Sequence, residues 1–583
     1  MLAVRRSLFA LAVIGTLIAL TAILVNALGV DGSFGLEWAM VALFICQMPW
    51  AIIGFWNAII GLAVLHGHRS PLSLLLPWWR QVDPQAPLTT RTAVIMPVYN
   101  EDPERVFRHL ATVVESLDAT GWEAAFEIFL LSDSDDPTIL AEEERRFEAW
   151  RQRTPGGAAR LHYRRRATNV GKKVGNVWDF LERWGASFEH FVILDADSVM
   201  AGATLVRLVQ IMEAKPKIGI LQTLVVGLPT VSPFARIFQF GMRHSMRAYT
   251  AGSVWWQGPD GPYWGHNAII RTRAFCDHCR LPVLPGKPPL GGAILSHDQV
   301  EATLMRRGGF DVWVIPEEGG SYEENPPHLP AFLKRDLRWC QGNMQYFKLL
   351  AHPGLRPMGR LQLALAIVMY TAAPCWYGFM ALGLLALVTT GAAPVGEGGF
   401  ATAVGLFAAV MTMVFAPVVA GFVDVLLRPA ARRAYGGGQR LWQGLSLQLG
   451  FSLLLGPAMA LIHTLFILGL PFGRQVVWGR QQRDSCAVSW GSALRSFWPQ
   501  LVVGSGMLLA LGYLAPHLLP WGLPVVLGLV LAIPFARWTS LEAFGQWLTR
   551  RALCAIPEEI HPPYEVRRLG LAAVDLNPLP GDS

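Results

Sequence analysis

Charged residues are scarce in this chain: Asp, Glu, Lys and Arg together make up 16% of its 583 residues. Soluble domains carry roughly 25% charged residues on average. Hydrophobic residues account for 52% of the sequence, which is above the usual share. This balance excludes an ordinary water-soluble protein. It predicts an integral membrane protein that carries a sizeable polar insertion.

Cysteine is also scarce, and nothing in its spacing indicates a disulfide framework. The seven Cys are scattered and odd in number. Cys276 and Cys279 have a metal-like spacing, but no second pair accompanies them, which favours reduced thiols in a cytosolic loop. Zinc-finger spacings and long basic tracts are absent, and the net charge of +7 comes largely from residues near apolar spans and in the polar region. We therefore expect membrane orientation and anionic ligands, and no nucleic-acid partner.

Long apolar runs lie on both sides of the polar region. The runs at 7–30 and 38–65 are each long enough to span a bilayer of ~30 Å. Their basic outer flanks predict that the N-terminus is cytoplasmic. The sequence therefore predicts two N-terminal transmembrane helices in 1–70, a cytoplasmic domain with interfacial helices in 71–360, a second transmembrane region in 361–537 and a cytoplasmic tail in 538–583.

One apolar stretch, 444–470, is long for one span and short for two. The loops on either side of it, 428–440 and 472–495, each contain several Arg, which is typical of cytoplasmic loops. We therefore expect a kinked or re-entrant hairpin around Gly456 and Pro457, a shape tolerated only where protein or a water-filled cavity lines it. An ordinary kinked span, with 472–495 outside, is the alternative.

The polar region has the pattern of an α/β domain. Short apolar segments alternate with helical patterns such as 102–116 and 136–152, and this alternation predicts a largely parallel sheet. Strands are expected at 93–98, 127–132, 191–195, 218–223, 267–271 and 312–315.

An acidic pair follows the expected strand at 191–195. Asp195 and Asp197 would lie outside the carboxyl end of that strand, where open α/β sheets bind ligands. Two carboxylates one residue apart suit Mg²⁺ or Mn²⁺, which favour carboxylate oxygens and keep coordination sites for substrate phosphates. Asp197 is the expected metal ligand. Asp195 is expected to contact the donor sugar or ribose and is a second candidate ligand. A surface turn is the alternative, because Asp is common in turns.

Polar residues after the first two strands suit a nucleotide. Tyr99 and Glu101 follow the first strand. Asp133 follows the second, nearest the strand end, and is the candidate to bind a base or ribose. A capped helix N-terminus is the alternative for the first of these loops. Basic runs follow at 164–166 and at 171–176, where glycines flank Lys173 and would let its ammonium group approach a diphosphate. A solvated basic face is the alternative for these runs.

The segment 263–267, with the sequence YWGHN, presents aromatic faces and polar groups before a strand. Carbohydrate sites commonly combine apolar ring faces with a few placed polar groups. Tyr263, Trp264 and His266 are therefore candidate acceptor-binding residues. Packing of Trp264 in the core is the alternative.

Asp298 and the helix at 334–341 complete the candidate site. Asp298 precedes a helix and is a candidate general base, a role typically worth about 10²–10⁴-fold in rate. Its alternative role is that of the helix N-cap. Arg335 and Arg338 share one face of the later helix and would stabilise a leaving diphosphate, with Trp339 beside the acceptor. An interfacial anchor is the alternative for this helix.

These motifs resemble the processive glycosyltransferases of family 2, membrane-bound enzymes related to cellulose and hyaluronan synthases. The resemblance implies a GT-A fold with an Asp for uridine, a D-x-D pair, a T/E-D base and a Q-x-x-R-W helix. The matching positions here are Asp133, Asp195 with Asp197, Asp298, and Arg335 with Arg338 and Trp339. The base motif is Ser-His-Asp, and Arg335 replaces Gln, so a neutral acceptor contact is not implied.

The motifs LSDSDDP, YRRR, LDADSVM, ILSHDQVEA and RDLRWCQGN narrow the resemblance. Over about residues 90–490 they resemble the glucans biosynthesis glucosyltransferase H family, inner-membrane enzymes that make osmoregulated periplasmic glucans. The resemblance implies UDP-glucose as donor, a growing β-1,2-glucan as acceptor and export through the membrane. The partners it implies are membrane lipids, acyl carrier protein and periplasmic glucan-modifying proteins. The chain begins shortly before its first span, so the long N-terminal extension of some members is not expected.

The motif GRQQRD at 479–484 occupies the position of the gating loop of cellulose synthases. Two other enzymatic readings remain open: a non-processive transferase that glycosylates a lipid phosphate carrier, and another polysaccharide synthase of the cellulose synthase type. A catalytically silent transport or sensor protein is the alternative from another class. An intact set of Asp133, Asp197 and Asp298 argues against it.

Overall fold

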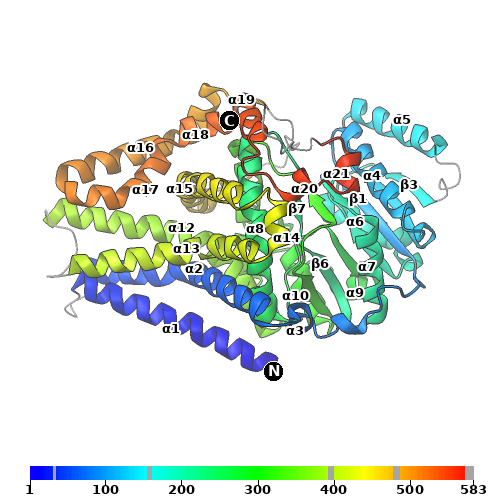
Figure 1. The fold of residues 1–583 in the computed structure, drawn as a ribbon, viewed down its shortest axis with the longest axis horizontal. Helices are drawn as coiled ribbons and strands as arrows, with labels where there is room; N and C mark the ends of the chain where they lie inside the picture. The colour runs from blue at the N-terminus through cyan, green and yellow to red at the C-terminus, as the bar shows by residue number, and fades with distance from the viewer. Residues whose placement is uncertain (30–34, 154–159, 391–398, 477–485, 572–583) are drawn as a thin grey trace.

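The computed structural model describes residues 1–29, 35–153, 160–390, 399–476 and 486–571. A helical bundle forms one half of the molecule and a sheet domain the other, with the long helix α8 (Pro233–Gln257) between them (Figure 1). The proposed gating motif at 479–484 lies outside the described residues.

The domain is built on a seven-stranded sheet with the strand order β3-β2-β1-β4-β8-β6-β9. All six expected strands are present, and β3, which ends in the basic run at 164–166, was not predicted. The sheet is mixed, because β8 runs antiparallel to both β4 and β6, while the other neighbouring pairs are parallel. The strands are β1 (Thr92–Val98), β2 (Phe126–Ser132), β3 (Leu161–Arg165), β4 (His190–Ile193), β6 (Ile218–Thr223), β8 (Ala268–Arg271) and β9 (Asp311–Ile315).

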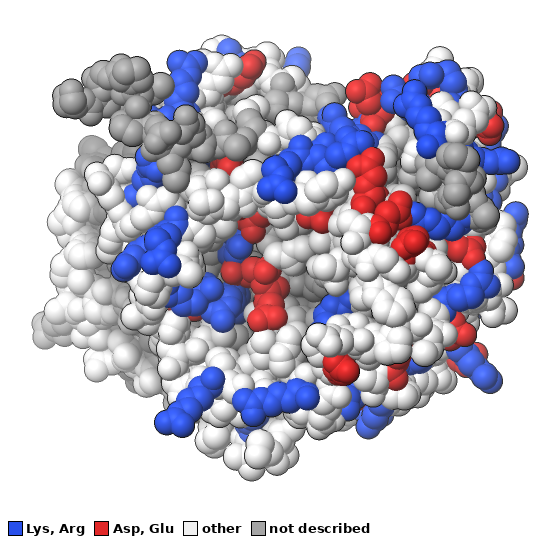
Figure 2. All heavy atoms as spheres, turned by 45° about the vertical axis from the view of Figure 1, so that its right-hand side comes forward, with Lys and Arg blue, Asp and Glu red and all other residues white. Residues whose placement is uncertain are grey.

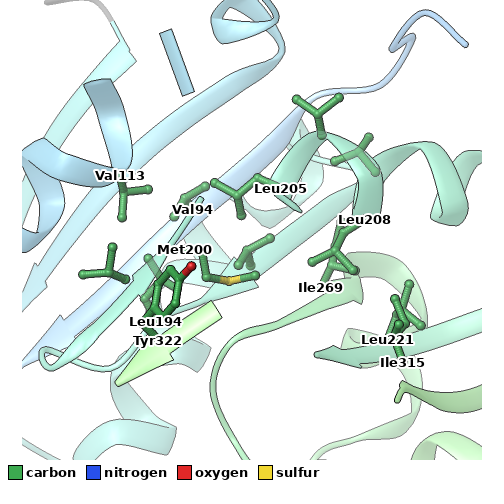
Figure 3. Packing of buried hydrophobic residues seen from close by; sticks show 14 of the residues in the cluster. Val94, Val113, Leu194, Met200, Leu205, Leu208, Leu221, Ile269, Ile315 and Tyr322 are labelled. Carbon is green, nitrogen blue, oxygen red and sulfur yellow. The ribbon is translucent and has the colours of Figure 1, made fainter. Parts of the chain in front are cut away.

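Both faces of the sheet are covered, which explains why its strands are apolar throughout. In β1, Val94 and Met96 belong to one buried cluster and Ala93 and Ile95 to another. Figure 3 shows the first cluster, where residues of α4 and α7 pack over the strands. The helices around the sheet are α4 (Pro103–Asp118), α5 (Pro137–Arg153), α6 (Lys172–Trp184), α7 (Gly202–Ala214), α9 (Thr272–His278), α10 (Asp298–Arg307) and α11 (Leu329–Gln345).

A second, three-stranded sheet lies beside the carboxyl ends of the main strands. Its order is β5 (Ser198–Met200), β10 (Ser321–Glu323) and β7 (Val226–Gly227). In its register Glu323 is opposite Ser198, the residue that follows Asp197. Strands this short leave little periodic signal, so the sequence did not predict them.

The protein is a multi-pass membrane protein with an inserted GT-A domain. Six described helices are long and apolar enough to cross a membrane, and a bent pair, α17 (Leu519–Val530) with α18 (Ala532–Trp538), could supply a seventh span. Figure 2 shows broad uncharged surface on the side of the helical bundle, while charged side chains of both signs gather on the domain. The six helices are α1 (Leu2–Leu28), α2 (Leu36–Gly67), α12 (Pro357–Thr390), α13 (Gly399–Leu427), α15 (Gly438–Gly469) and α16 (Trp490–Leu514).

The stretch 444–470 is a single helix, and the expectation of a re-entrant hairpin is wrong. Helix α15 continues without interruption through Gly456 and Pro457. Near its start Gln448 lies 3.0 Å from His244 of α8, and near its end His463 pairs with Asp336 of α11. Both parts of α15 therefore contact helices that adjoin the sheet domain. These packing partners, rather than a chain reversal, hold this apolar stretch in place.

The C-terminal segment packs on the domain through α19 (Glu542–Arg550), α20 (Pro557–Ile560) and α21 (Tyr564–Arg568). Glu559 pairs with the fully buried Arg236 of α8 at 2.5 Å, and Arg568 pairs with Glu115 of α4 at 2.5 Å. The described tail thus connects α8, which lies beside the membrane bundle, with α4 of the sheet domain (Figure 1).

Candidate active site

Lys173 and Asp195 join two loops at the carboxyl edge of the sheet. Lys173, near the start of α6, forms an ion pair with Asp195 and donates to the Gly265 carbonyl at 2.8 Å. The backbone around this contact is unusual, since Lys172 has φ 53° and Gly265 has φ 83°. Strained conformations of this kind concentrate at functional sites. The structure thus brings together two residues that the sequence placed in one pocket.

Asp197 lies at the inner side of the same loop and is 7% exposed. Its carbonyl accepts the Glu324 N–H at 3.1 Å, and the pairing of β5 with β10 holds Glu323 beside it. His266 joins this group, because its Nδ1 lies 3.4 Å from Ser198 Oγ and its Nε2 3.4 Å from Glu323 Oε2. An acidic group, Glu323, is thereby added to the expected pair.

Glu323 was missed in the sequence because only a three-residue strand carries it. Burial raises the pKa of Glu323; His266 and Arg335 oppose this rise, whereas Asp197 and Asp195 add to it. The charges of the acidic pair and of Arg335 therefore both act on the Glu323 carboxylate. The run SYEEN, with two adjacent carboxylates after Ser321 and Tyr322, was the available signal.

The acidic residues fit a divalent ion that is completed by its substrate. Within the described residues, no group of three or more His, Cys, Asp or Glu is arranged to hold a metal ion by itself. Mg²⁺ typically binds one or two carboxylates together with waters and substrate phosphates. Asp197, with Asp195 beside it, supplies that kind of partial ligand set.

Asp133 follows β2, as expected, but its carboxylate forms an ion pair with the guanidinium of Arg166. Asp133 is 5% exposed and accepts from Arg166 Nε at 2.7 Å and from a terminal nitrogen at 2.5 Å. The neighbouring Arg164 is buried and donates to the Asn176 carbonyl at 3.0 Å. The idea of an entirely solvated basic face at 164–166 is therefore wrong for these two arginines. Binding of a base or ribose by Asp133 stays a prediction.

The loop after β1 is tied to the loop after β2 by Asn100. Its Nδ2 donates to Asp135 at 2.6 Å, and its Oδ1 accepts from the N–H groups of Asp135 and Asp136 at 3.1 Å. Tyr99 donates to Asp135 at 3.1 Å, and Glu101 lies just beyond. Asp135, rather than Asp133, therefore sits beside Tyr99, a partnership that spacing in the sequence could not reveal.

Asp298 is the first residue of α10, and its side chain does not cap the helix. His297 occupies the N-cap position without a side-chain cap hydrogen bond. A Cβ built on Gly265 would lie 3.4 Å from the Asp298 Cβ, so Asp298 adjoins the residue that accepts from Lys173. The N-cap alternative is wrong, and Asp298 lies next to the Lys173–Asp195 pair.

Helix α11 brings the arginines to the same edge. The Arg335 guanidinium lies 4.9 Å from the centre of the Trp339 ring, and Trp339 is 40% exposed. Burial lowers the pKa of Lys172, and the nearby charge of Arg338 lowers it further. Arg338 is therefore close to the start of α6, where Lys173 also lies. This helix lines the site from the membrane side.

The expected acceptor residues at 263–267 divide into two groups. Tyr263 is 2% exposed and belongs to a buried cluster on the sheet, which does not fit a role in binding sugar. Trp264 is half-buried and its backbone N–H donates to Gln222 Oε1 at 2.9 Å, while His266 contacts Glu323. Trp264 and His266 are left as candidates. Tyr263 is a core residue because the sheet packs around its ring.

Known proteins match this chain over most of its length. A model described as glycosyl transferase family 2 matches residues 93–278, and one described as glycosyl transferase family group 2 matches residues 190–423. Glucans biosynthesis glucosyltransferase H of Cupriavidus pinatubonensis is 40% identical over 94% of this chain and 64% of its own length. The protein of that name from Xanthomonas campestris pv. campestris is 37% identical over 93% of this chain and 85% of its own.

The chain spans less than two thirds of the Cupriavidus relative and most of the Xanthomonas one. Among solved structures, a mannosyltransferase from Pyrobaculum calidifontis in complex with GDP-Man and Mn²⁺ covers 64% of this chain and 99% of its own. It is 19% identical with a TM-score of 0.38, a likeness that decides nothing about this site.

Proposed function

Because the chain belongs to the glucans biosynthesis glucosyltransferase H family, we propose that it transfers glucose from UDP-glucose to a growing β-1,2-glucan. One observation carries this proposal. Lys173, the acidic pair, Asp298 and the arginines of α11 lie at one edge of the sheet, next to the membrane helices. A donor and an acceptor bound at this edge would react beside the bundle.

The donor would lie across the carboxyl ends of β1, β2 and β4. Tyr99, Glu101 and Asp133 would contact the nucleoside, with Asp133 positioned by Arg166. Lys173 and Arg338 would face the diphosphate, where fixed positive charge stabilises the charge that develops on the leaving group. Arg335 would add to this field from the other side of Glu323.

Asp197, together with Asp195, would hold a divalent cation against the diphosphate. Mg²⁺ or Mn²⁺ bound there would act as a Lewis acid and neutralise part of the leaving-group charge. Asp195 is paired with Lys173 in this structure, so donor binding would redistribute that contact. The protein itself would place the carboxylates of Asp195 and Asp197 and the ammonium group of Lys173 within reach of the same phosphates.

Asp298 would act as the general base of an inverting transfer. Its carboxylate would take the proton from the acceptor hydroxyl as that oxygen attacks the anomeric carbon from the face opposite UDP. The bond from the anomeric carbon to UDP breaks in the same step, and no covalent enzyme intermediate is needed. Trp264, His266 and Trp339 would orient the acceptor chain, since aromatic faces and a few polar groups suit sugars.

Repeated transfer would move the polymer toward the membrane. Helix α11 packs against α12 and α15, so the acceptor side of the site adjoins helices that suit a bilayer. We infer a processive enzyme of the bacterial inner membrane, with its sheet domain in the cytoplasm and its product exported. Acyl carrier protein and periplasmic glucan-modifying proteins are further proposed partners.

The test is incubation of membranes containing the protein with radiolabelled UDP-glucose, followed by size and linkage analysis of the product. The proposal expects a β-1,2-linked polymer that forms only when a divalent cation is present. A single sugar on a lipid phosphate carrier would reject polymer synthesis. A polymer with another linkage would indicate a synthase of the cellulose type.

A further inference from the structure

Helix α11 has two faces with different neighbours. Arg335 and Arg338 recur at helical spacing, and their charges act on Glu323 and Lys172 at the candidate active site, while Trp339 packs against Arg335. The side chain of Asp336 is turned about 100° from that of Arg335, as one helical step requires. It points toward the membrane helices instead, where it meets residues of α12 and α15.

Asp336 is the meeting point of three helices. One carboxylate oxygen accepts from the Tyr370 hydroxyl of α12 at 3.3 Å, and the other pairs with His463 Nε2 of α15. The rings of Tyr370 and His463 also meet edge to face, with their centres 5.1 Å apart. The side chains of Asp336 and His463 are 14% and 16% exposed, so water has little access to the pair.

Two more hydrogen bonds extend this contact along the same helix. Asn343 Nδ2 donates to the Ala366 carbonyl of α12 at 3.3 Å. Gln341 Oε1 accepts the N–H of Val476, which follows α15, at 2.8 Å. Three residues of α11 thus contact the transmembrane region through directional hydrogen bonds. Purely apolar packing would let α11 slide along the membrane helices.

We propose that Asp336 and His463 are positioning residues that set the register of α11, and with it Arg335, Arg338 and Trp339, against the membrane helices. Neither residue touches the reacting atoms. The inference rests on the proposed function, because it assigns these residues an effect on glucosyl transfer. Tyr370 is the third member of the contact.

The physical reason lies in the burial of the pair. A buried polar contact to a carboxylate often adds little net stability, since desolvation offsets the attraction, but it can specify one arrangement among several. Displacing a positioned group by about 1 Å can cost about 10²-fold in rate. A shift of α11 would move the arginines that face the diphosphate and the Trp that faces the acceptor together.

The experiment separates positioning from simple stabilisation. His463→Leu removes one of the two partners of the Asp336 carboxylate, leaving only Tyr370, and should lower the melting temperature. The double variant Asp336→Ala with His463→Leu also removes the buried carboxylate and should melt at a higher temperature than His463→Leu. Transfer of glucose should nevertheless stay reduced by about 10- to 100-fold in Asp336→Ala, His463→Leu and the double variant. The dissociation constant for UDP should stay near that of the wild type in all three.

Two further variants serve as matched controls. His463→Gln keeps an N–H donor near the carboxylate and should retain most of the wild-type rate. His66→Leu makes the same change at another His–Asp contact, where the exposed His66 lies 2.8 Å from the buried Asp424. Arg247 and Arg428 also pair with Asp424, so this variant should leave the rate unchanged.

The outcomes are distinct. Recovery of transfer together with melting temperature in the double variant would show a merely structural role and overturn the proposal, as would wild-type rates in the single variants. If Asp336→Ala does not fold, His463→Leu and His463→Gln still decide the matter. A wild-type enzyme that makes no glucan from UDP-glucose would instead reject the proposed function.

Discussion

His266 Nε2 lies 3.4 Å from the Glu323 carboxylate, and this contact joins the loop before β8 to the small sheet that carries Asp197. Glu323 also lies in the electrostatic field of Arg335. In the Q-x-x-R-W pattern that this helix resembles, Gln stands where this chain has Arg335. Arg335 is therefore accompanied by a carboxylate that is only partly exposed.

Glu323→Gln should lower glucosyl transfer by about tenfold, the scale of losing one charged contact near 1.4 kcal/mol. The neutral amide keeps the shape of Glu323 but no longer balances His266 and Arg335. Steady-state rates with UDP-glucose would measure the effect. Glu324→Gln is the matched control, because that side chain faces His109 and Arg105 instead. Equal transfer rates for Glu323→Gln and Glu324→Gln would show that Glu323 does not contribute to the site.

Asp298→Asn should abolish glucan synthesis while UDP binding and folding stay nearly intact. The amide cannot accept the proton of the acceptor hydroxyl, and loss of a general base typically costs about 10²–10⁴-fold. Polymer yield and UDP affinity would be measured on the same preparation. Polymer formation by Asp298→Asn at the wild-type rate would show that another group is the base.

Removal of divalent cations with EDTA should stop transfer and weaken UDP binding in the wild type. Asp197→Ala should bind UDP as weakly with Mg²⁺ or Mn²⁺ as the wild type does with EDTA, because one carboxylate contact to the ion is gone. Calorimetric titration of UDP with and without each metal would check this. A metal-dependent gain in UDP affinity that is unchanged in Asp197→Ala would contradict the assignment.

Acid should destabilise the fold through His190 of β4. Burial lowers the pKa of His190 to about 3, and the charge of Arg271 contributes. In the unfolded chain the same group titrates near its ordinary pKa of about 6.5. The unfolded state therefore binds a proton that the folded state excludes, and stability is lost as the pH falls below about 6.5 toward 3.

Thermal melting at pH 7.5 and pH 5.5 would measure this effect, with His190→Asn as the comparison. Asn does not titrate and can replace the Nδ1 contact to Thr90 at 3.4 Å. We expect a smaller acid-induced fall in melting temperature for His190→Asn than for the wild type. The same fall in both proteins would assign the acid sensitivity to other groups.

The division into apolar spans and an α/β domain followed from the sequence, because long apolar runs and short buried strands differ in length and flanking charge. The six expected strands are present for the same reason, and the predicted carboxylates lie at or just beyond the ends of these strands. Tyr263 was misassigned because aromatic residues suit both a sugar site and a core, and only packing separates the two. The hairpin at 444–470 was misassigned because flanking charge does not reveal which helices α15 packs against.

The sequence alone selected Asp195, Asp197, Lys173 and Asp298 as candidate site residues, since each follows a strand or lies at the start of a helix. Their partners were decided by tertiary structure: Glu323 beside His266, Arg166 on Asp133, and His463 on Asp336. Local residue preferences extend over a few positions, and these contacts join residues that lie far apart in the chain or on strands too short to leave a pattern. The chemical type of each candidate residue can therefore be read from the local sequence, whereas the residue that it pairs with depends on the fold.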